Sequence, residues 1–346
     1  MPPLLSFHRH PGGGTMKRIL INLLKLAVVA LCFSIIARKI HVHDALAQLA
    51  GASLPLMGAA GLTILLEPLL VAIKWNILLR EKGINLGVAR LLRIVFTSNF
   101  LSVTLPTSLG ADALRLLMVK GERQSLTHAA GALMADRLLG ALSIITLSLV
   151  GTALVGRRAL DTRSLLSILT VALLVLAVAG VLISRLPVRW VPRLRRWAAR
   201  RAGSPPPAAA LQWVLKAVDK AQAIHDSLRS FGGHRVRLAQ VFLLNISAQG
   251  LRVLQIGLLF QAVHHPVPWT EAAAFVPLIV LMAMLPISFF GLGVKENTFF
   301  YFFGRAGVPN EVSLAVLVIT YPLIVAAMLP GAVFVLLNVL RRPAAS

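Results

Sequence analysis

Long apolar runs constrain the fold of this chain more than any other feature. A helix needs about 20 residues to cross the hydrocarbon core of a membrane. Six runs of about that length occur, at residues 19–36, 54–73, 129–155, 165–183, 241–263 and 314–340. Hydrophobic residues make up 57% of the chain and charged residues 14%, which excludes an ordinary soluble domain. The sequence therefore predicts an all-α polytopic membrane protein with about six full transmembrane helices.

Two further apolar segments, at residues 91–119 and 272–303, are each interrupted in the middle. The interruptions are Leu105-Pro-Thr-Ser-Leu-Gly-Ala-Asp112 and Leu285-Pro-Ile-Ser-Phe-Phe-Gly-Leu-Gly293, which share a Leu-Pro-x-Ser start and a following glycine. Each half is too short to cross alone, so we expect two re-entrant helical hairpins. Simple helix kinks and a fold of eight looser crossings remain alternatives. Paired broken helices in the two halves of a membrane protein point to the binding site of a transporter.

Basic residues between the apolar runs predict the orientation. Lys17 and Arg18 precede the first run, Arg341 and Arg342 follow the last, and residues 185–237 contain twelve Arg and Lys. The positive-inside rule then places both termini and the 185–237 loop in the cytoplasm. The two hairpins would enter from opposite faces, in an inverted arrangement. The basic loop is expected to bind anionic lipids of the cytoplasmic leaflet.

The formal net charge of +23 raises nucleic acid as a partner. The basic residues cluster between apolar runs, however, and no recognition module is apparent, so we expect no nucleic-acid binding. Residues 1–15 are expected to be a disordered extension, and residues 16–346 a single transmembrane domain. Cys32 is the only cysteine, which leaves no disulfide framework and no metal motif. We expect no cofactor.

Glu67 and Lys74 lie at or near membrane depth in the second apolar run. An ionisable side chain there costs roughly 2.5–3.5 kcal/mol, so it usually faces a cavity or a partner. The two residues are about 10 Å apart along a helix, which makes direct pairing unfavourable. Glu67 is our candidate for proton coupling. Lys74 either faces the interior or extends to the cytoplasmic interface.

Polar residues also occur in the third and fifth full-length runs. Asp136 and Arg137 are adjacent, so they face different directions on a helix and need partners elsewhere. Asn245, Gln249 and Arg252 have the i, i+4, i+7 spacing of one helix face, which we expect to point inward. A structural ion pair at Asp136 and Arg137, or a structural lock at Arg252, is the alternative.

The hairpins suggest how an anion would be held. A half-helix is expected to begin after Gly110, with Ser108 or Asp112 as its cap and Arg115 one turn inside. Helix N-termini bind phosphate and carboxylate groups through free N–H donors. The predicted substrate-binding residues are Asn99, Pro106, Ser108, Gly110, Asp112, Arg115, Asp136, Arg137, Gln249, Arg252, Pro286, Gly291, Gly293, Lys295 and Glu296. Together they predict a cationic interior with a few carboxylates, suited to an anionic lipid head group.

Three stretches carry a family resemblance: Asn99–Arg115, Ala135-Asp-Arg-Leu-Leu-Gly140 and Pro286–Glu296. They resemble the transmembrane region of the lysylphosphatidylglycerol synthase family, whose members are flippase-like membrane proteins. The family usually has Gly-Gly-Asp-x-x-Arg where this chain has Gly110-Ala-Asp-Ala-Leu-Arg115, Glu-Arg at Asp136-Arg137, and Arg-Glu at Lys295-Glu296. The resemblance implies translocation of a lipid or a lipid-linked sugar in a bacterial inner membrane. Members serve aminoacylated phospholipid, isoprenoid-linked sugar and hopanoid pathways, so it does not fix the substrate.

Three functions follow as expectations. The first is a translocator of an anionic phospholipid, isoprenoid-phosphate-linked or hopanoid-type lipid without chemistry of its own, because no appended synthase domain is recognisable. The second is a lipid-modifying enzyme of the polyprenyl-phosphate glycosyltransferase type, with Asp112, Asp136 or Glu296 catalytic. The third is a scaffold that recruits a lipid biosynthetic enzyme through residues 185–237.

Overall fold

The computed structural model describes residues 51–102, 110–121, 125–155, 222–283 and 293–340, together with the single positions 173 and 219. The expected extension at 1–15, the runs at 19–36 and 165–183, and most of the 185–237 loop lie outside the described residues. So do both interruptions, with Pro106, Ser108, Pro286 and Gly291. Every element in the described part is helical.

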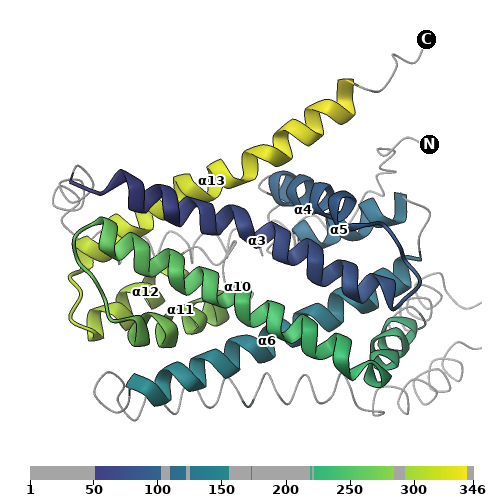
Figure 1. Cartoon of the computed structure of the whole chain (residues 1–346), viewed down its shortest axis with the longest axis horizontal. Coiled ribbons are helices and arrows are strands. Elements are labelled where there is room, and N and C mark those ends of the chain that lie inside the picture. Colours follow the sequence, from purple (N-terminus) through teal and green to yellow (C-terminus); the bar gives the residue numbers. More distant parts are fainter. Residues whose placement is uncertain are drawn as a thin grey trace, which may run out of the picture.

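Four long helices form the body of the molecule. They are α3 (Leu54–Arg80), α6 (Leu126–Val155), α10 (Arg235–Ala262) and α13 (Asn310–Leu340). Each is long and apolar enough to cross a membrane, and the four run along the long axis of the molecule (Figure 1). They confirm the runs predicted at 54–73, 129–155, 241–263 and 314–340. The protein is therefore an all-α polytopic membrane protein.

Two pairs of short helices complete the bundle. α4 (Val88–Ser102) packs on α5 (Gly110–Gly121), and α11 (Trp269–Ala283) packs on α12 (Val294–Arg305). With 15 and 12 residues in each pair, these helices are about 22 and 18 Å long, shorter than the roughly 30 Å of hydrocarbon. α4 and α5 lie at the end of the bundle where α3 ends, whereas α11 and α12 lie at the opposite end (Figure 1).

Small residues allow the short helices to approach the long ones. A Cβ atom added at Gly151 of α6 would lie 2.6 Å from the backbone nitrogen of Ala274 in α11. A Cβ atom at Gly331 of α13 would overlap the carbonyl oxygen of Phe96 in α4. Contacts of this kind let backbones touch where apolar lipid provides no hydrophobic drive for association. Each short-helix pair is thus fixed to a different long helix through a glycine.

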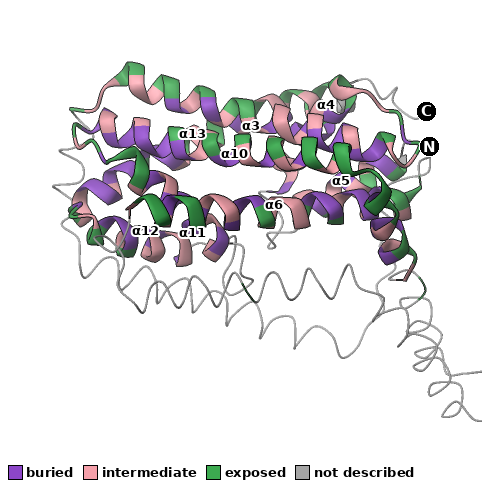
Figure 2. Cartoon of the chain, turned by 60° about the horizontal axis from the view of Figure 1, so that its bottom comes forward, coloured by how far each residue is buried: buried purple, intermediate pink, exposed green. Residues whose placement is uncertain are grey.

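Apolar residues fill the interior and also cover the exterior. Five phenylalanine rings from α10, α11 and α12 pack together at one end, with the Phe260 and Phe303 ring centroids 4.7 Å apart and the Phe299 and Phe303 centroids 4.5 Å apart. Large exposed apolar side chains occur on all four long helices, for example Leu62, Leu149, Leu243 and Leu329. In Figure 2 the long helices carry both buried and exposed residues along their length. An apolar exterior is the surface expected to face lipid.

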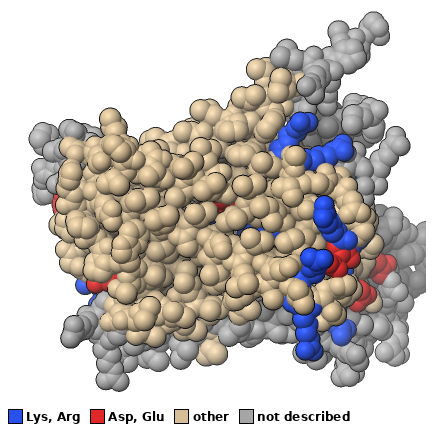
Figure 3. All heavy atoms as spheres, in the orientation of Figure 1, with Lys and Arg blue, Asp and Glu red and all other residues tan. Residues whose placement is uncertain are grey.

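Surface charge gathers at the end of the bundle that holds α4 and α5. On the face drawn in Figure 3, most of the visible Lys and Arg lie at that end, and the remaining surface is largely uncharged. The exposed basic residues around it are Arg80, Arg90, Arg93, Lys120, Arg235 and Arg237.

At the same end, side-chain contacts join the C-terminal end of α3 to the start of α10 and the segment that precedes it. The carboxylate of Glu81 lies 2.8 Å from Nδ1 of His234 and 3.2 Å from Nε of Arg237. Lys82 donates to the carbonyl oxygen of Ser227 and the hydroxyl of Ser230. Burial lowers the pKa of Lys82, an effect that the neighbouring carboxylate of Glu81 partly offsets. This cluster joins residues more than 140 positions apart in the chain.

Candidate functional site

A cavity of about 580 Å³ lies inside the bundle. All eight α-helices named above contribute to its lining, including both helices of each short pair. Its charged lining residues are Glu67, Lys74, Asp112, Arg115, Asp136, Arg137, Arg252 and Lys295. Charged groups in the interior of a membrane bundle usually mark a substrate or ion pathway. The cavity is therefore the candidate functional site.

Asp112 is the centre of the first charged cluster. It lies in the first turn of α5, and its two carboxylate oxygens are 2.6 and 2.5 Å from Nη2 of Arg137 in α6. Arg115, one turn further along α5, donates from Nη1 to the same carboxylate at 3.2 Å. Nη2 of Arg115 also donates to Asn99 Oδ1 at 2.8 Å, and its Nε donates to Ser98 Oγ at 3.2 Å. One carboxylate thus connects both helices of the first short pair to a long helix.

Lys74 and Asp136 form the second cluster, between α3 and α6. Lys74 Nζ lies 3.0 Å from Asp136 Oδ1 and donates to Asn245 Oδ1 of α10 at 2.7 Å. Asn245 Nδ2 faces the same Asp136 oxygen at 3.4 Å. All three side chains are buried. The alternative in which Lys74 extends to the interface is therefore wrong, because its ammonium group is held inside the bundle by an acceptor on each of two other helices.

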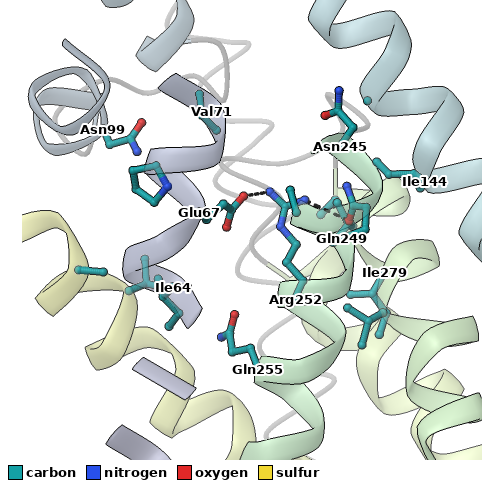
Figure 4. Close-up of a pocket in the computed structure, with 18 of the residues that line it drawn as sticks. Ile64, Glu67, Val71, Asn99, Ile144, Asn245, Gln249, Arg252, Gln255 and Ile279 are labelled. Atoms are coloured by element: carbon teal, nitrogen blue, oxygen red, sulfur yellow. Dashed lines mark hydrogen bonds and ion pairs between the residues drawn. The ribbon is translucent and has the colours of Figure 1, made fainter. Parts of the chain in front are cut away.

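Glu67 and Arg252 form the third cluster, which joins α3 to α10. Arg252 Nη2 donates to Glu67 Oε1, and its Nη1 donates to Gln249 Oε1 at 3.3 Å (Figure 4). Pro68 follows Glu67 on the cavity wall. Because proline has no N–H, the carbonyl of Ile64, four residues earlier, loses its intrahelical partner beside the cavity. As expected, Glu67 and Lys74 do not pair with each other.

Lys295 reaches the cavity from α12. Its Nζ lies 5.5 Å from the centroid of the Tyr321 ring. The neighbouring Glu296 is buried, and its Oε2 accepts from the backbone N–H of Gly293, which has φ of 81° at the start of α12. Glu296 therefore caps its own helix, where the helix dipole favours a negative charge. Neither Glu296 nor Gly293 belongs to the described cavity lining.

Most of the predicted site converges on the cavity. The predicted residues found in its lining are Glu67, Asn99, Asp112, Arg115, Asp136, Arg137, Gln249, Arg252 and Lys295. Gly110 begins α5, as expected. Asn245, Gln249 and Arg252 do form one inward polar face. Gln255 extends that face by almost one more turn, and its helical spacing could have identified it.

Other lining residues were not predicted as ligands. Lys74 contacts Asp136, and Asn245 contacts both of these charged groups. Ser102 and Thr320 add hydroxyl groups from α4 and α13. Thr320 lies in an apolar helix with no polar periodicity in its sequence, so only packing places it at the cavity. Among the described residues, no group of three His, Cys, Asp or Glu side chains is placed to hold a metal ion.

Comparison with known proteins identifies the family. The family model described as the lysylphosphatidylglycerol synthase TM region matches residues 22–331, most of the chain. The chain belongs to this family. No curated protein and no solved structure matches it. The matched region includes all three sequence stretches that carried the resemblance, and the structure brings their charged residues Asp112, Arg115, Asp136, Arg137 and Lys295 to one cavity.

Membership of this family supports the conclusion that the chain is a multi-pass membrane protein in lipid metabolism. This chain has a lysine at position 295, where the resemblance led us to expect an arginine. A lysine presents a point charge and not the planar fork of a guanidinium group. In this chain that point charge faces the cavity beside an aromatic ring.

Proposed function

We propose that the protein moves the polar head group of a lipid across a bacterial inner membrane through this cavity, without a chemical step of its own. The acyl or isoprenoid tails would remain in the bilayer. The single observation that carries the proposal is a charged cavity lined by the eight α-helices named above, inside a bundle with an apolar exterior. An anionic phospholipid, an isoprenoid-linked phosphate and a hopanoid-type lipid all have a polar end that would need such a path.

Access to the charged lining supports this proposal. The side chains of Arg137, Arg252 and Glu67 retain 42, 31 and 27% exposure, although they line the interior. In Figure 3 an acidic and a basic group are visible near the middle of the face, within a largely uncharged surface. A sideways opening of this kind would admit a head group from the bilayer while the tails stay outside.

The proposed orientation follows the surface charge. The end with Arg80, Arg90, Arg93 and Lys120 would face the cytoplasm by the positive-inside rule. The α4–α5 pair would then re-enter from the cytoplasm and the α11–α12 pair from the opposite face. Both termini would be cytoplasmic. The basic 185–237 loop would lie on the same side and bind anionic lipids there.

The ion pairs suggest how transport would proceed. The pairs Glu67–Arg252, Asp112–Arg137 and Asp136–Lys74 each join two different helices, so a change of partner can be coupled to a helix movement. An anionic head group that binds Arg252 would compete with Glu67, and one that binds Arg137 would compete with Asp112. A carboxylate released in this way can take up a proton, which makes Glu67 the proposed proton-coupling residue.

The test is a transport assay on purified protein in liposomes. Fluorescent phosphatidylglycerol and fluorescent phosphatidate are tested separately: each is placed in one leaflet, and its movement is followed by chemical quenching of the outer leaflet. We expect movement above that of protein-free liposomes for at least one of the two lipids, weakened in Asp112→Ala and Arg137→Ala but retained in Lys120→Gln, an exposed residue at the end of α5. Equal movement of both lipids with and without protein would overturn the proposal. A change in the mass of the lipid would favour the enzyme alternative.

A further inference from the structure

Positive charge exceeds negative charge on the cavity wall. The described lining contains five basic residues (Lys74, Arg115, Arg137, Arg252 and Lys295) and three acidic residues (Glu67, Asp112 and Asp136). The two short segments that connect the halves of each helix pair, 103–109 and 284–292, contain no charged residue. At neutral pH the described lining therefore carries two formal positive charges in excess.

The excess can be assigned to particular side chains. The three carboxylates each pair with a cation from another helix, as Glu67–Arg252, Asp112–Arg137 and Asp136–Lys74. Arg115 shares the carboxylate of Asp112, and its other described partners are neutral oxygens of Ser98 and Asn99. Lys295 has no ion pair within the described residues, and Tyr321 offers it only a neutral ring. The excess charge therefore belongs to Arg115 and Lys295.

Lys295 is the more available of the two. Its neighbour Glu296 directs one carboxylate oxygen to the backbone N–H of Gly293, where it caps α12. The neighbouring Glu296, and Arg252 and Glu67 on the cavity wall, all act electrostatically on the Lys295 charge. Lys295 and Arg252 thus present two cations to the same region of the cavity.

We propose that the cavity selects a head group with two negative charges, the phosphomonoester or pyrophosphate end of a lipid, and that Lys295 with Arg252 binds its phosphate. This inference rests on the proposed function and names the substrate class of the same site. A dianion would neutralise both excess charges, whereas a phosphodiester lipid such as phosphatidylglycerol would leave one. A phosphatidylglycerol that carries a lysyl group has a net positive charge and would add to the excess. A lysine ammonium group is well suited to bind phosphate as a point charge.

The first experiment compares ligands on the wild-type protein. The full chain in detergent is titrated with dioctanoyl phosphatidate, dioctanoyl phosphatidylglycerol, dioctanoyl phosphatidylcholine and glycerol 3-phosphate, and dissociation constants are measured by calorimetry. We expect phosphatidate to bind at least about tenfold more tightly than the other three, the effect of one charge-assisted hydrogen bond. Equal binding of phosphatidate and phosphatidylglycerol would overturn the charge selection. Equal binding of glycerol 3-phosphate would assign the site to a soluble phosphate and overturn its assignment to a lipid.

The second experiment uses variants of Lys295, the residue proposed to bind the phosphate. Lys295→Met should lose about tenfold in affinity for phosphatidate, while Lys295→Arg and the exposed control Lys120→Gln should keep it. The unliganded Lys295→Met protein should melt no lower than wild type, because the change removes a half-buried cation that forms no ion pair within the described residues. Wild-type affinity in Lys295→Met, or loss of affinity in Lys120→Gln, would overturn the assignment.

Binding and transport separate the two proposals. Selective phosphatidate binding without movement in liposomes would sustain this inference and overturn the proposed translocation. Movement of lipids without preference for a dianionic head group would sustain the proposed translocation and overturn this inference.

Discussion

Arg137 in α6 holds both carboxylate oxygens of Asp112 in α5, and Arg115 contacts one of the same oxygens at 3.2 Å. Asp112 therefore provides the negative charge for two arginines, and Arg115 also donates to the neutral oxygens of Ser98 and Asn99. Removing the carboxylate leaves two cations uncompensated. Removing Arg137 leaves Asp112 still bound to Arg115.

We predict that Asp112→Ala is more damaging than Arg137→Ala. Loss of one partner of a buried ion pair costs about 3–5 kcal/mol; the partial exposure of Arg137 reduces its share. The melting temperature in detergent should fall further for Asp112→Ala, and lipid movement in liposomes should follow the same order. A larger fall for Arg137→Ala would contradict the central role of Asp112.

The Lys74–Asp136 pair offers a test of burial. Asp136→Leu leaves the Lys74 ammonium group buried with only Asn245 as its described partner, so stability should fall by about 3–5 kcal/mol. The double variant Lys74→Met/Asp136→Leu should recover most of that loss, since no charge then remains. Chemical unfolding of the two variants measures the difference. If the double variant is no more stable than Asp136→Leu, the pair is not the source of the effect.

Two glycines in transmembrane helices should respond in opposite ways to the same substitution. Gly331→Ala places a Cβ atom against the backbone of Phe96, so it should destabilise the protein by about 1–3 kcal/mol. Gly250→Ala has nothing within 4 Å and should be neutral or stabilising by up to about 1 kcal/mol, because alanine favours helix. Thermal unfolding of both variants in the same detergent is the comparison. If the melting temperature falls in both variants, the loss of stability comes from glycine flexibility and not from helix packing.

The opposite placement of the short-helix pairs can be tested by labelling. In a Cys32→Ser background, Asn85→Cys and Ser125→Cys flank the α4–α5 pair, while Pro266→Cys and Pro309→Cys flank the α11–α12 pair. All four positions are exposed in the described structure. The first two should react with a membrane-impermeant thiol reagent from the cytoplasmic side, and the last two from the other side. Labelling of all four from one side would refute the inverted arrangement.

Apolar length and helix periodicity were enough to predict much of this protein. The long helices α3, α6, α10 and α13 agree with predicted runs because crossing a bilayer requires about 20 apolar residues, a purely local property. The inward face of Asn245, Gln249 and Arg252 followed from helical spacing alone. The sequence also located both short-helix pairs, because proline and glycine interrupt the apolar pattern between their halves.

The partners of the charged residues depended on tertiary structure. Glu67 lies 185 positions from Arg252, and Lys74 lies 171 positions from Asn245, so no local pattern could join them. Sequence reasoning left Lys74 between interface and interior, and only packing of α3 against α6 and α10 decided it. The sequence by itself determined which of the described segments are long and apolar enough to cross a membrane, and that charge lies within them. Tertiary structure decided which charges neutralise one another and that Lys295 is left facing a cavity, because ion pairing depends on distances between helices and not on spacing within one.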